Sequence, residues 1–111
     1  MKLLNGAMSG KILETYVVSE ILKSYYHNGR EPNISFYRDT EQREIDLILE
    51  ENGKLYPIEI KKTANPDISD CSSFKFLQKL NKEIGVGAVI CFQPERIPLT
   101  RDIVSIPVWE I

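Results

Sequence analysis

The chain has 111 residues, close to the commonest size of a single domain, and its 42% apolar and 27% charged residues are typical of a globular protein. The net charge of −2 argues against a strongly basic nucleic-acid binder. A local basic patch stays compatible with it, because affinity follows the Lys and Arg residues that contact phosphate. No apolar run is long enough to span a membrane, and the start at residues 1–4 is too short, and is broken too soon by Asn5-Gly6, for a signal peptide. We therefore expect one cytoplasmic domain over residues 1–111.

The cysteine and histidine content excludes one class of metal site. Cys71 and Cys91 are the only cysteines, they form no CxxC pair, and His27 is the single histidine. This set cannot build a zinc ribbon or a Cys/His cluster. The two cysteines are isolated from each other, and the apolar residues Ile90 and Phe92 flank Cys91, so we expect two buried, reduced thiols.

The first predicted element is a helix from about Gly10 to Tyr25, which Ser9 can cap and Asn28-Gly29 terminates. Glu14 falls within its apolar stripe, among Val17, Val18, Ile21 and Tyr25. A buried carboxylate is costly unless it is paired or binds a cation. The alternative is that Glu14 lies at the edge of the buried sector and reaches water.

Three strands follow, at residues 34–38, 43–50 and 54–62. Asn52-Gly53 joins the second strand to the third between alternating apolar runs, which is the strongest short-range signal of a β-hairpin. If these two residues form the turn, Asp46 lies directly opposite Glu59. The charged residues then share one face of the hairpin: Glu44, Asp46, Glu59 and Lys61. The opposite face is a core face: Ile45, Leu47, Leu49, Tyr56, Ile58 and Ile60.

A second helix is predicted to begin at Asp67, Ser69 or Asp70 and to run to about Glu83. Its apolar residues recur at helical spacing: Phe74, Leu77, Leu80 and Ile84. Residues 86–92 form an apolar run typical of a buried central strand, and residues 102–109 form a last strand. Pro107 places the end of that strand at a sheet edge.

The connections between these elements predict the fold class. A strand–helix–strand crossover requires the third and fourth strands to be parallel, whereas the hairpin before it is antiparallel. The sequence therefore predicts an α/β fold with a mixed sheet flanked by helices.

Two carboxylates directly opposite each other destabilise a strand pair. At about 5 Å and an effective dielectric near 20 the repulsion is roughly 3 kcal/mol. A divalent cation bound to carboxylate oxygens offsets this repulsion far more than a nearby lysine does. The alternative is a solvated face with screened charges, on which Lys61 forms a salt bridge to Glu44.

Glu14, Asp46 and the triplet Glu59-Ile60-Lys61 resemble the acid-plus-E-x-K signature of the PD-(D/E)XK nuclease superfamily. The predicted order of elements is similar to that superfamily's restriction-endonuclease-like core, α-β-β-β-α-β. Ile45 stands where the superfamily name has a proline, a position at which proline is often missing.

Three longer segments, GKILETYVVSEILK, FYRDTEQREIDLILEENGKLYPIEIKKT and IPVW, resemble the C-terminal domain of unknown function of many bacterial and archaeal AAA+ ATPases. This resemblance spans nearly the whole chain. The sequence holds no phosphate-binding GxxxxGK[ST] loop. If the parent protein is an ATPase, we therefore expect this chain to be its C-terminal part.

The resemblance implies a phosphodiesterase that depends on Mg²⁺ or Mn²⁺ and acts on DNA. It implies that Asp46, Glu59 and the backbone carbonyl of Ile60 bind the metal ion, and that Glu14 holds a metal-bound water or a second metal. Lys61 would position or deprotonate the attacking water and balance charge in the transition state.

Four residues are candidates for contacting nucleic acid. Arg38 and Arg43 flank the site, and Lys62 and Gln78 are further candidates. The alternative for Lys62 is a solvated surface. The aromatic residues, Phe36 among them, fall mainly on expected core positions, so no stacking platform for single strands is indicated.

Three functions fit these observations: a metal-dependent DNA nuclease or resolvase-like domain, a catalytically silent module that binds DNA or protein, and a structural or oligomerisation domain. The complete acid, acid and lysine set favours the first two, whereas the acidic net charge favours the silent module over the nuclease. We expect a nuclease-like domain with a complete metal site, and leave open whether it cuts. Its expected partners are DNA, an AAA+ ATPase domain and, by the resemblance to dimeric branched-DNA nucleases, a second copy of itself.

Overall fold

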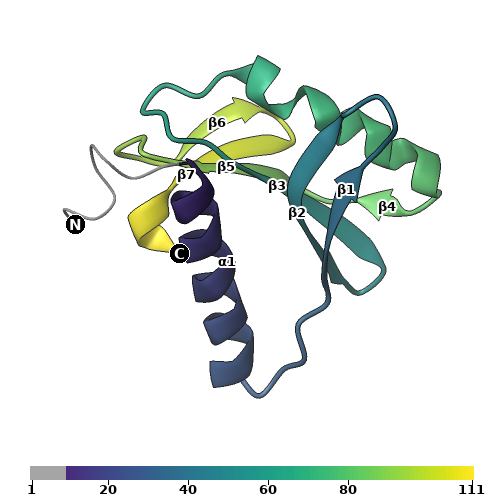
Figure 1. Cartoon of the computed structure of the whole chain (residues 1–111), viewed down its shortest axis with the longest axis horizontal. Coiled ribbons are helices and arrows are strands. Elements are labelled where there is room, and N and C mark those ends of the chain that lie inside the picture. The colour runs from purple at the N-terminus through teal and green to yellow at the C-terminus, as the bar shows by residue number, and fades with distance from the viewer. Residues whose placement is uncertain (1–9) are drawn as a thin grey trace.

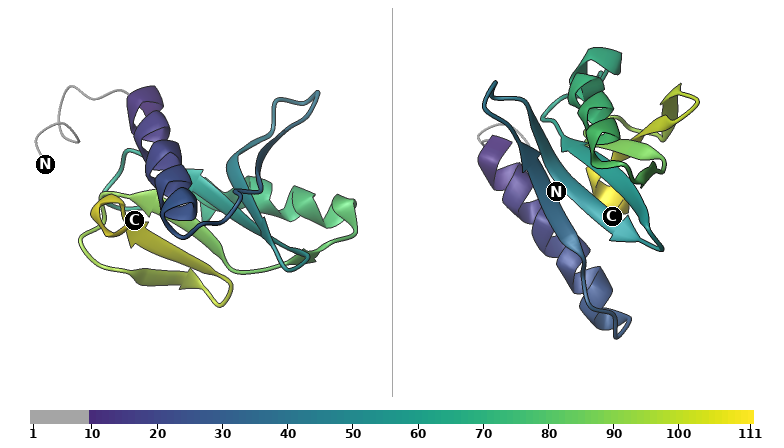
Figure 2. Two further views of the ribbon diagram at one scale, coloured as in Figure 1. Left: turned by 90° about the horizontal axis from the view of Figure 1, so that it is seen from below. Right: turned by 90° about the vertical axis from the view of Figure 1, so that its right-hand side faces the viewer.

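The structure is a computed structural model that describes residues 10–111. In this part of the chain a seven-stranded sheet has the order β1-β2-β3-β5-β7-β6, and β4 pairs with β3 beside that path. The helix α1 (Gly10–His27) covers one face of the sheet and the 3-10 helix η2 (Ile68–Leu80) covers the other (Figures 1 and 2). The fold is therefore α/β with a mixed open sheet.

The remaining elements are β1 (Ile34–Arg38), β2 (Glu44–Glu51), β3 (Lys54–Ile60), β4 (Glu83–Ile84), β5 (Gly87–Cys91), β6 (Ile97–Thr100), β7 (Ile103–Pro107) and the short 3-10 helix η3 (Val108–Glu110). β3, β5 and β7 run parallel, whereas β1, β2 and β6 are antiparallel to their neighbours. The predicted parallel crossover from β3 to β5 is confirmed, and so is the burial of β5, all of whose residues are buried.

The β2–β3 hairpin has the predicted two-residue turn. Its register runs from Glu51 opposite Lys54 to Leu47 opposite Ile58. Asn52 and Gly53 have φ angles of 54° and 81°, in the left-handed region that a tight hairpin turn requires and that Asn and Gly adopt readily. Local turn chemistry therefore determines the register of the hairpin from its turn to Leu47 and Ile58.

The second helix begins as predicted. Asp67 caps η2 by accepting the N–H of Ser69, and the carboxylate of Asp70 accepts the N–H of Asp67 in return. The helix ends earlier than predicted, at Leu80, because Asn81 adopts a left-handed conformation with φ of 53°. Residues 83 and 84 then form β4 against β3 instead of a last helical turn.

Two predictions about the C-terminal strands are wrong. The strand β6 was not predicted, and it forms the edge of the sheet that was expected for β7. Pro98 in β6 is tolerated because an edge strand leaves some backbone N–H groups unpaired. Pro107 is buried beside Cys91 at the end of the interior strand β7. The predicted lead-in and the Ser9 cap lie outside the described residues.

The core has two layers, one on each face of the sheet. The layer under α1 contains Leu13, Val17, Leu47, Ile58, Ile60, Ala88, Ile90 and Val108. The layer under η2 contains Ile45, Ile48, Leu55, Cys71, Phe74, Leu77, Val89 and Cys91. The hairpin therefore contributes apolar residues to the core on both faces. Of its four predicted charged residues Glu59 is buried, whereas Glu44 is exposed, so the alternative of a solvated charged face is wrong for Glu59 only.

The two cysteines are buried and free, as predicted. Burial raises the pKa of the Cys71 thiol to about 12, which makes it unreactive. No helix in the described part of the chain has the length and apolar character needed to cross a membrane.

Candidate functional site

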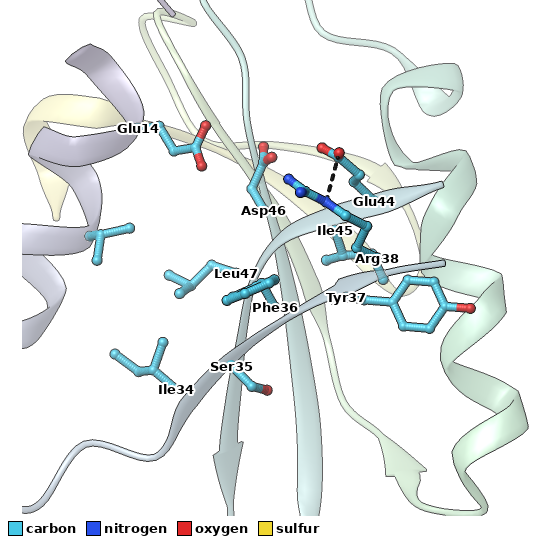
Figure 3. A pocket seen from close by; sticks show the side chains of 11 residues that line it. Glu14, Ile34, Ser35, Phe36, Tyr37, Arg38, Glu44, Ile45, Asp46 and Leu47 are labelled. Atoms are coloured by element: carbon cyan, nitrogen blue, oxygen red, sulfur yellow. Dashed lines mark ion pairs between the residues drawn. The ribbon is translucent and has the colours of Figure 1, made fainter. Parts of the chain in front are cut away.

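A β-bulge in β2 positions the first candidate acid. The register of β1 against β2 shifts by one residue at Phe36, so Phe36 lies opposite both Asp46 and Leu47. As a result Ile45 packs in the core layer under η2, whereas Leu47 packs in the layer under α1. The prediction that Ile45 and Leu47 share a face is wrong for this reason. The side chain of Asp46 points to the α1 side of the sheet (Figure 3).

Asp46 and Glu59 are connected across β2 and β3, one position beyond the last regular pair. The N–H of Asp46 donates to Oε1 of Glu59 at 3.3 Å. The N–H of Ile60 donates to Oδ2 of Asp46 at 2.9 Å. Each carboxylate therefore accepts a hydrogen bond from the strand that carries the other. The two acids are neighbours, as predicted, although regular pairing of the strands ends at Leu47 and Ile58. The prediction that they share one face of the hairpin is wrong, because the bulge turns Asp46 to the α1 side, whereas Glu59 alternates with Ile58 and Ile60, which pack in the layer under α1.

Glu59 is the more unusual of the two acids, because its side chain is buried with the residue only 6% exposed. Burial, followed by repulsion from the charge of Asp46, raises the pKa of Glu59 to about 7. Lys61 partly opposes this shift, with its Nζ 3.9 Å from Oε2 of Glu59. The lysine is thus beside Glu59, and the alternative salt bridge to Glu44 is not formed, since Glu44 pairs with Arg38 at 3.0 Å.

Glu14 extends from α1 toward Asp46 across a groove (Figure 3). Glu14 is partly exposed, so the alternative expectation, that it lies at the edge of the buried sector of the helix and reaches water, is correct. Burial, together with the charges of Asp46 and Glu44, raises its pKa. Within residues 10–111 no three Asp, Glu, His or Cys side chains are close enough together to hold a metal ion. Glu14 is therefore not part of one cluster with Asp46 and Glu59.

The donor atoms that remain fit a hard divalent cation. Asp46 and Glu59 supply carboxylate oxygens, which Mg²⁺ prefers, and Mg²⁺ commonly uses only one or two carboxylates together with water and substrate phosphate. The N–H of Ile60 is directed toward Asp46, and the carbonyl of a strand residue points to the same side as its N–H. These residues could therefore form a two-carboxylate site.

Arg38 lies in the groove beside Asp46, whereas Arg43 has another role. Its guanidinium pairs with Asp39 at 2.7 Å and Glu41 at 2.6 Å and stacks on the ring of Phe76 at 3.9 Å. Burial alone would raise the pKa of Asp39, but hydrogen bonds from the backbone and side chain of Arg43 lower it to about 2. Arg43 therefore anchors the β1–β2 connection to η2.

The two remaining nucleic-acid candidates are placed differently. Lys62 is exposed and directly follows Lys61 in the chain. Gln78 lines a separate hollow beside Gly85 and Gly87. The two glycines lie at or just before the start of β5, whereas Glu59 lies near the end of β3, which runs parallel to β5. Gln78 is therefore nearer the start of these strands and Glu59 nearer their end, and the structure does not bring Gln78 to the site.

Sequence reasoning missed the aromatic residue at the groove. Phe36 lines the groove and is 71% exposed, so its assignment to the core is wrong. Tyr26 and Trp109 are also exposed, at 64% and 50%. Side chains alternate along β1, so the sequence indicates that Phe36 points to the other face from its two neighbours. Its ring is exposed because β1 is the edge strand of the sheet.

Comparison with known proteins gives one result. A family model for a domain of unknown function, DUF4143, matches residues 9–111. No match was found among curated proteins or among solved structures. Because the matched region covers nearly the whole chain, the protein belongs to the DUF4143 family of domains of unknown function.

Proposed function

We propose that this domain is a metal-dependent phosphodiesterase that acts on DNA with a PD-(D/E)XK nuclease-like site. The observation that carries the proposal is the meeting of Asp46 and Glu59 through reciprocal hydrogen bonds, with Lys61 beside them. Under this proposal the α/β fold corresponds to a restriction-endonuclease-like core, and the domain belongs to that superfamily.

Each residue would have a distinct role. Asp46, Glu59 and the carbonyl of Ile60 would hold Mg²⁺ or Mn²⁺. When bound, the ion supplies Lewis acidity at the phosphoryl group and lowers the pKa of a coordinated water. Lys61 is half-exposed, so its ammonium group can orient a water and stabilise negative charge that develops on the phosphoryl oxygens. Glu14 can accept a hydrogen bond from water on the α1 side.

Two further features support a functional role for this pair. β-Bulges are over-represented next to active sites, where they redirect a side chain, and the bulge in β2 redirects Asp46. Burying Glu59 next to another carboxylate is unfavourable without a compensating cation. A purely structural hairpin would gain stability from apolar residues at these positions.

The wider context is part of the same proposal. The sequence segments that resemble AAA+ ATPase C-terminal domains support an ATPase domain as the partner that delivers DNA to this site. Cytoplasmic localisation and a homodimer would follow from that role.

Cleavage of radiolabelled linear and branched DNA, with and without Mg²⁺ or Mn²⁺, tests the proposal. We expect metal-dependent cleavage by the wild type and loss of at least about 100-fold in Glu59→Gln and Lys61→Met, as for the removal of one transition-state contact. Glu50→Gln is the matched control, because Glu50 lies on β2 and pairs with Lys82 away from the site. Cleavage that survives Glu59→Gln would refute the proposal.

The second candidate function is a catalytically silent module that binds DNA or protein for an ATPase. It is favoured by the acidity of the groove, where Glu14, Glu44 and Asp46 are accompanied, among residues 10–111, by one arginine, Arg38. Two results together would support this function: the wild type binds DNA as tightly as Glu59→Gln does, and it cleaves none of the DNA substrates with either metal ion.

A further inference from the structure

The groove between α1 and the β1–β2 strands is a second feature of the site, beyond the carboxylate pair. Glu14 and Val18 of α1 form one side, and residues 34–38 and 44–47 form the other (Figure 3). Asp46 belongs both to this groove and to the pair with Glu59. Whatever occupies the groove therefore lies next to the proposed reacting phosphate.

The size and the walls of the groove fit a flat apolar group. Its volume is about 630 Å³, within the range of small-molecule sites. Val18, Ile34 and Leu47 supply aliphatic surface. The ring of Phe36 is exposed on the edge strand β1 and is available for stacking. An exposed aromatic ring beside a candidate phosphodiesterase site is typical of contacts to nucleobases.

The polar groups of the groove indicate which bases fit. Glu14, Glu44 and Asp46 are acceptors, and such carboxylates bind the exocyclic amino groups of bases. Arg38 is the only cationic residue lining the groove in the described part of the chain, and Glu44 already pairs with it. Three carboxylates against one guanidinium make the groove unfavourable for a run of backbone phosphates.

We propose that this groove receives one unpaired nucleobase with an exocyclic amino group, stacked on Phe36, from the nucleic acid whose backbone passes Asp46 and Glu59. The inference rests on the proposed function and names its substrate class: single-stranded or branched nucleic acid with an unpaired nucleotide next to the scissile phosphate. A base inside a duplex is already stacked and paired, so it can enter only after the energetic cost of extrusion.

Fluorescence anisotropy with labelled single-stranded oligo-dC, oligo-dT and a blunt duplex tests this inference. The titrations use Ca²⁺ in place of Mg²⁺ and are repeated without divalent ion, so that binding is read without cleavage. We expect Phe36→Ala to weaken oligo-dC binding by about tenfold, as for loss of one base stack, and to leave duplex binding unchanged. Phe36→Tyr should keep wild-type affinity, and the wild type should prefer oligo-dC to oligo-dT.

Tyr26→Ala is the matched control, because Tyr26 is a similarly exposed aromatic residue that does not line the groove. It should bind all three probes like the wild type. An equal loss of single-strand and duplex binding in Phe36→Ala, or no loss at all, would overturn the inference. Sedimentation of the wild type as a dimer and of Phe36→Ala as a monomer would also overturn it, because the groove would then be an interface between copies.

The inference and the proposed function can fail separately. Binding of oligo-dC that depends on Phe36, with no cleavage in any metal, would keep the nucleobase site and refute the phosphodiesterase. Metal-dependent cleavage of duplex DNA that is unchanged in Phe36→Ala would keep the phosphodiesterase and refute the nucleobase site.

Discussion

Asp46 and Glu59 each accept a hydrogen bond from the strand that carries the other. Glu59 receives the N–H of Asp46 at 3.3 Å, and Asp46 receives the N–H of Ile60 at 2.9 Å. These backbone donors fix both carboxylates at the point where β2 and β3 stop pairing regularly. The two acids therefore form one unit, and a substitution of either should change the properties of both.

The first prediction concerns metal binding. Asp46→Asn retains an oxygen that can accept the N–H of Ile60, but it removes a charge from the pair. We expect calorimetric titration to show Mn²⁺ binding by the wild type, weakened by at least about tenfold in Asp46→Asn, since Mn²⁺ binds charged oxygen ligands. Glu50→Gln, on the same strand, should bind like the wild type. Equal binding by Asp46→Asn would contradict the assignment of Asp46 as a ligand.

The second prediction concerns pH. The pKa of Glu59 is about 7 in the folded protein against 4.5 ordinarily, so the folded state favours the protonated acid. Its contribution to stability is complete below about pH 4.5 and is lost as pH rises through 7; the difference amounts to about 3 kcal/mol at most. Urea unfolding in EDTA should therefore give a lower free energy of unfolding at pH 8 than at pH 5.

Glu59→Gln isolates this effect, because glutamine has no charge to bury. We expect the decline between pH 5 and pH 8 to be smaller in this variant than in the wild type. Addition of Mn²⁺ at pH 8 should stabilise the wild type and not the variant, because a ligand that binds only the folded state raises stability. A parallel decline in both proteins would show that other groups cause the pH dependence.

The third prediction concerns the attachment of η2. Leu77 is completely buried in the core layer under this helix, whereas Leu80 on the same helix is 48% exposed. Leu77→Ala should lower the free energy of unfolding by about 2–5 kcal/mol through lost burial and a residual cavity. Leu80→Ala should change it by less than about 1 kcal/mol. Chemical denaturation of the two variants makes the comparison, and similar losses would contradict the placement of the helix.

The fourth prediction concerns the start of β5. A Cβ atom at Gly87 would lie 2.7 Å from the ring of Phe74, so alanine there must displace a core side chain. We expect Gly87→Ala to destabilise the protein by about 1–3 kcal/mol. Gly10→Ala is the control, since a Cβ at Gly10 meets no atom within 4 Å. A thermal unfolding midpoint for Gly87→Ala equal to that of Gly10→Ala would show that the Phe74 contact is not close.

Much of the fold could be predicted because it depends on neighbouring residues. The turn at Asn52-Gly53 adopts left-handed backbone angles that these residue types favour, and the hairpin register follows from it. The cap at Asp67 is equally local. The short strands β4 and β6 were missed, since each forms only by pairing with a strand that the rest of the fold positions.

The candidate site divides in the same way. That Asp46 and Glu59 are neighbours across the hairpin, with Lys61 close behind, could be predicted from the sequence, because a two-residue turn sets which segments of β2 and β3 meet. Four features depend on the packing of the whole domain: Glu59 is buried, a bulge turns Asp46 toward α1, Phe36 is exposed and Gln78 lies elsewhere. Burial and direction depend on contacts between segments far apart in the chain, and no short pattern of residues encodes those contacts.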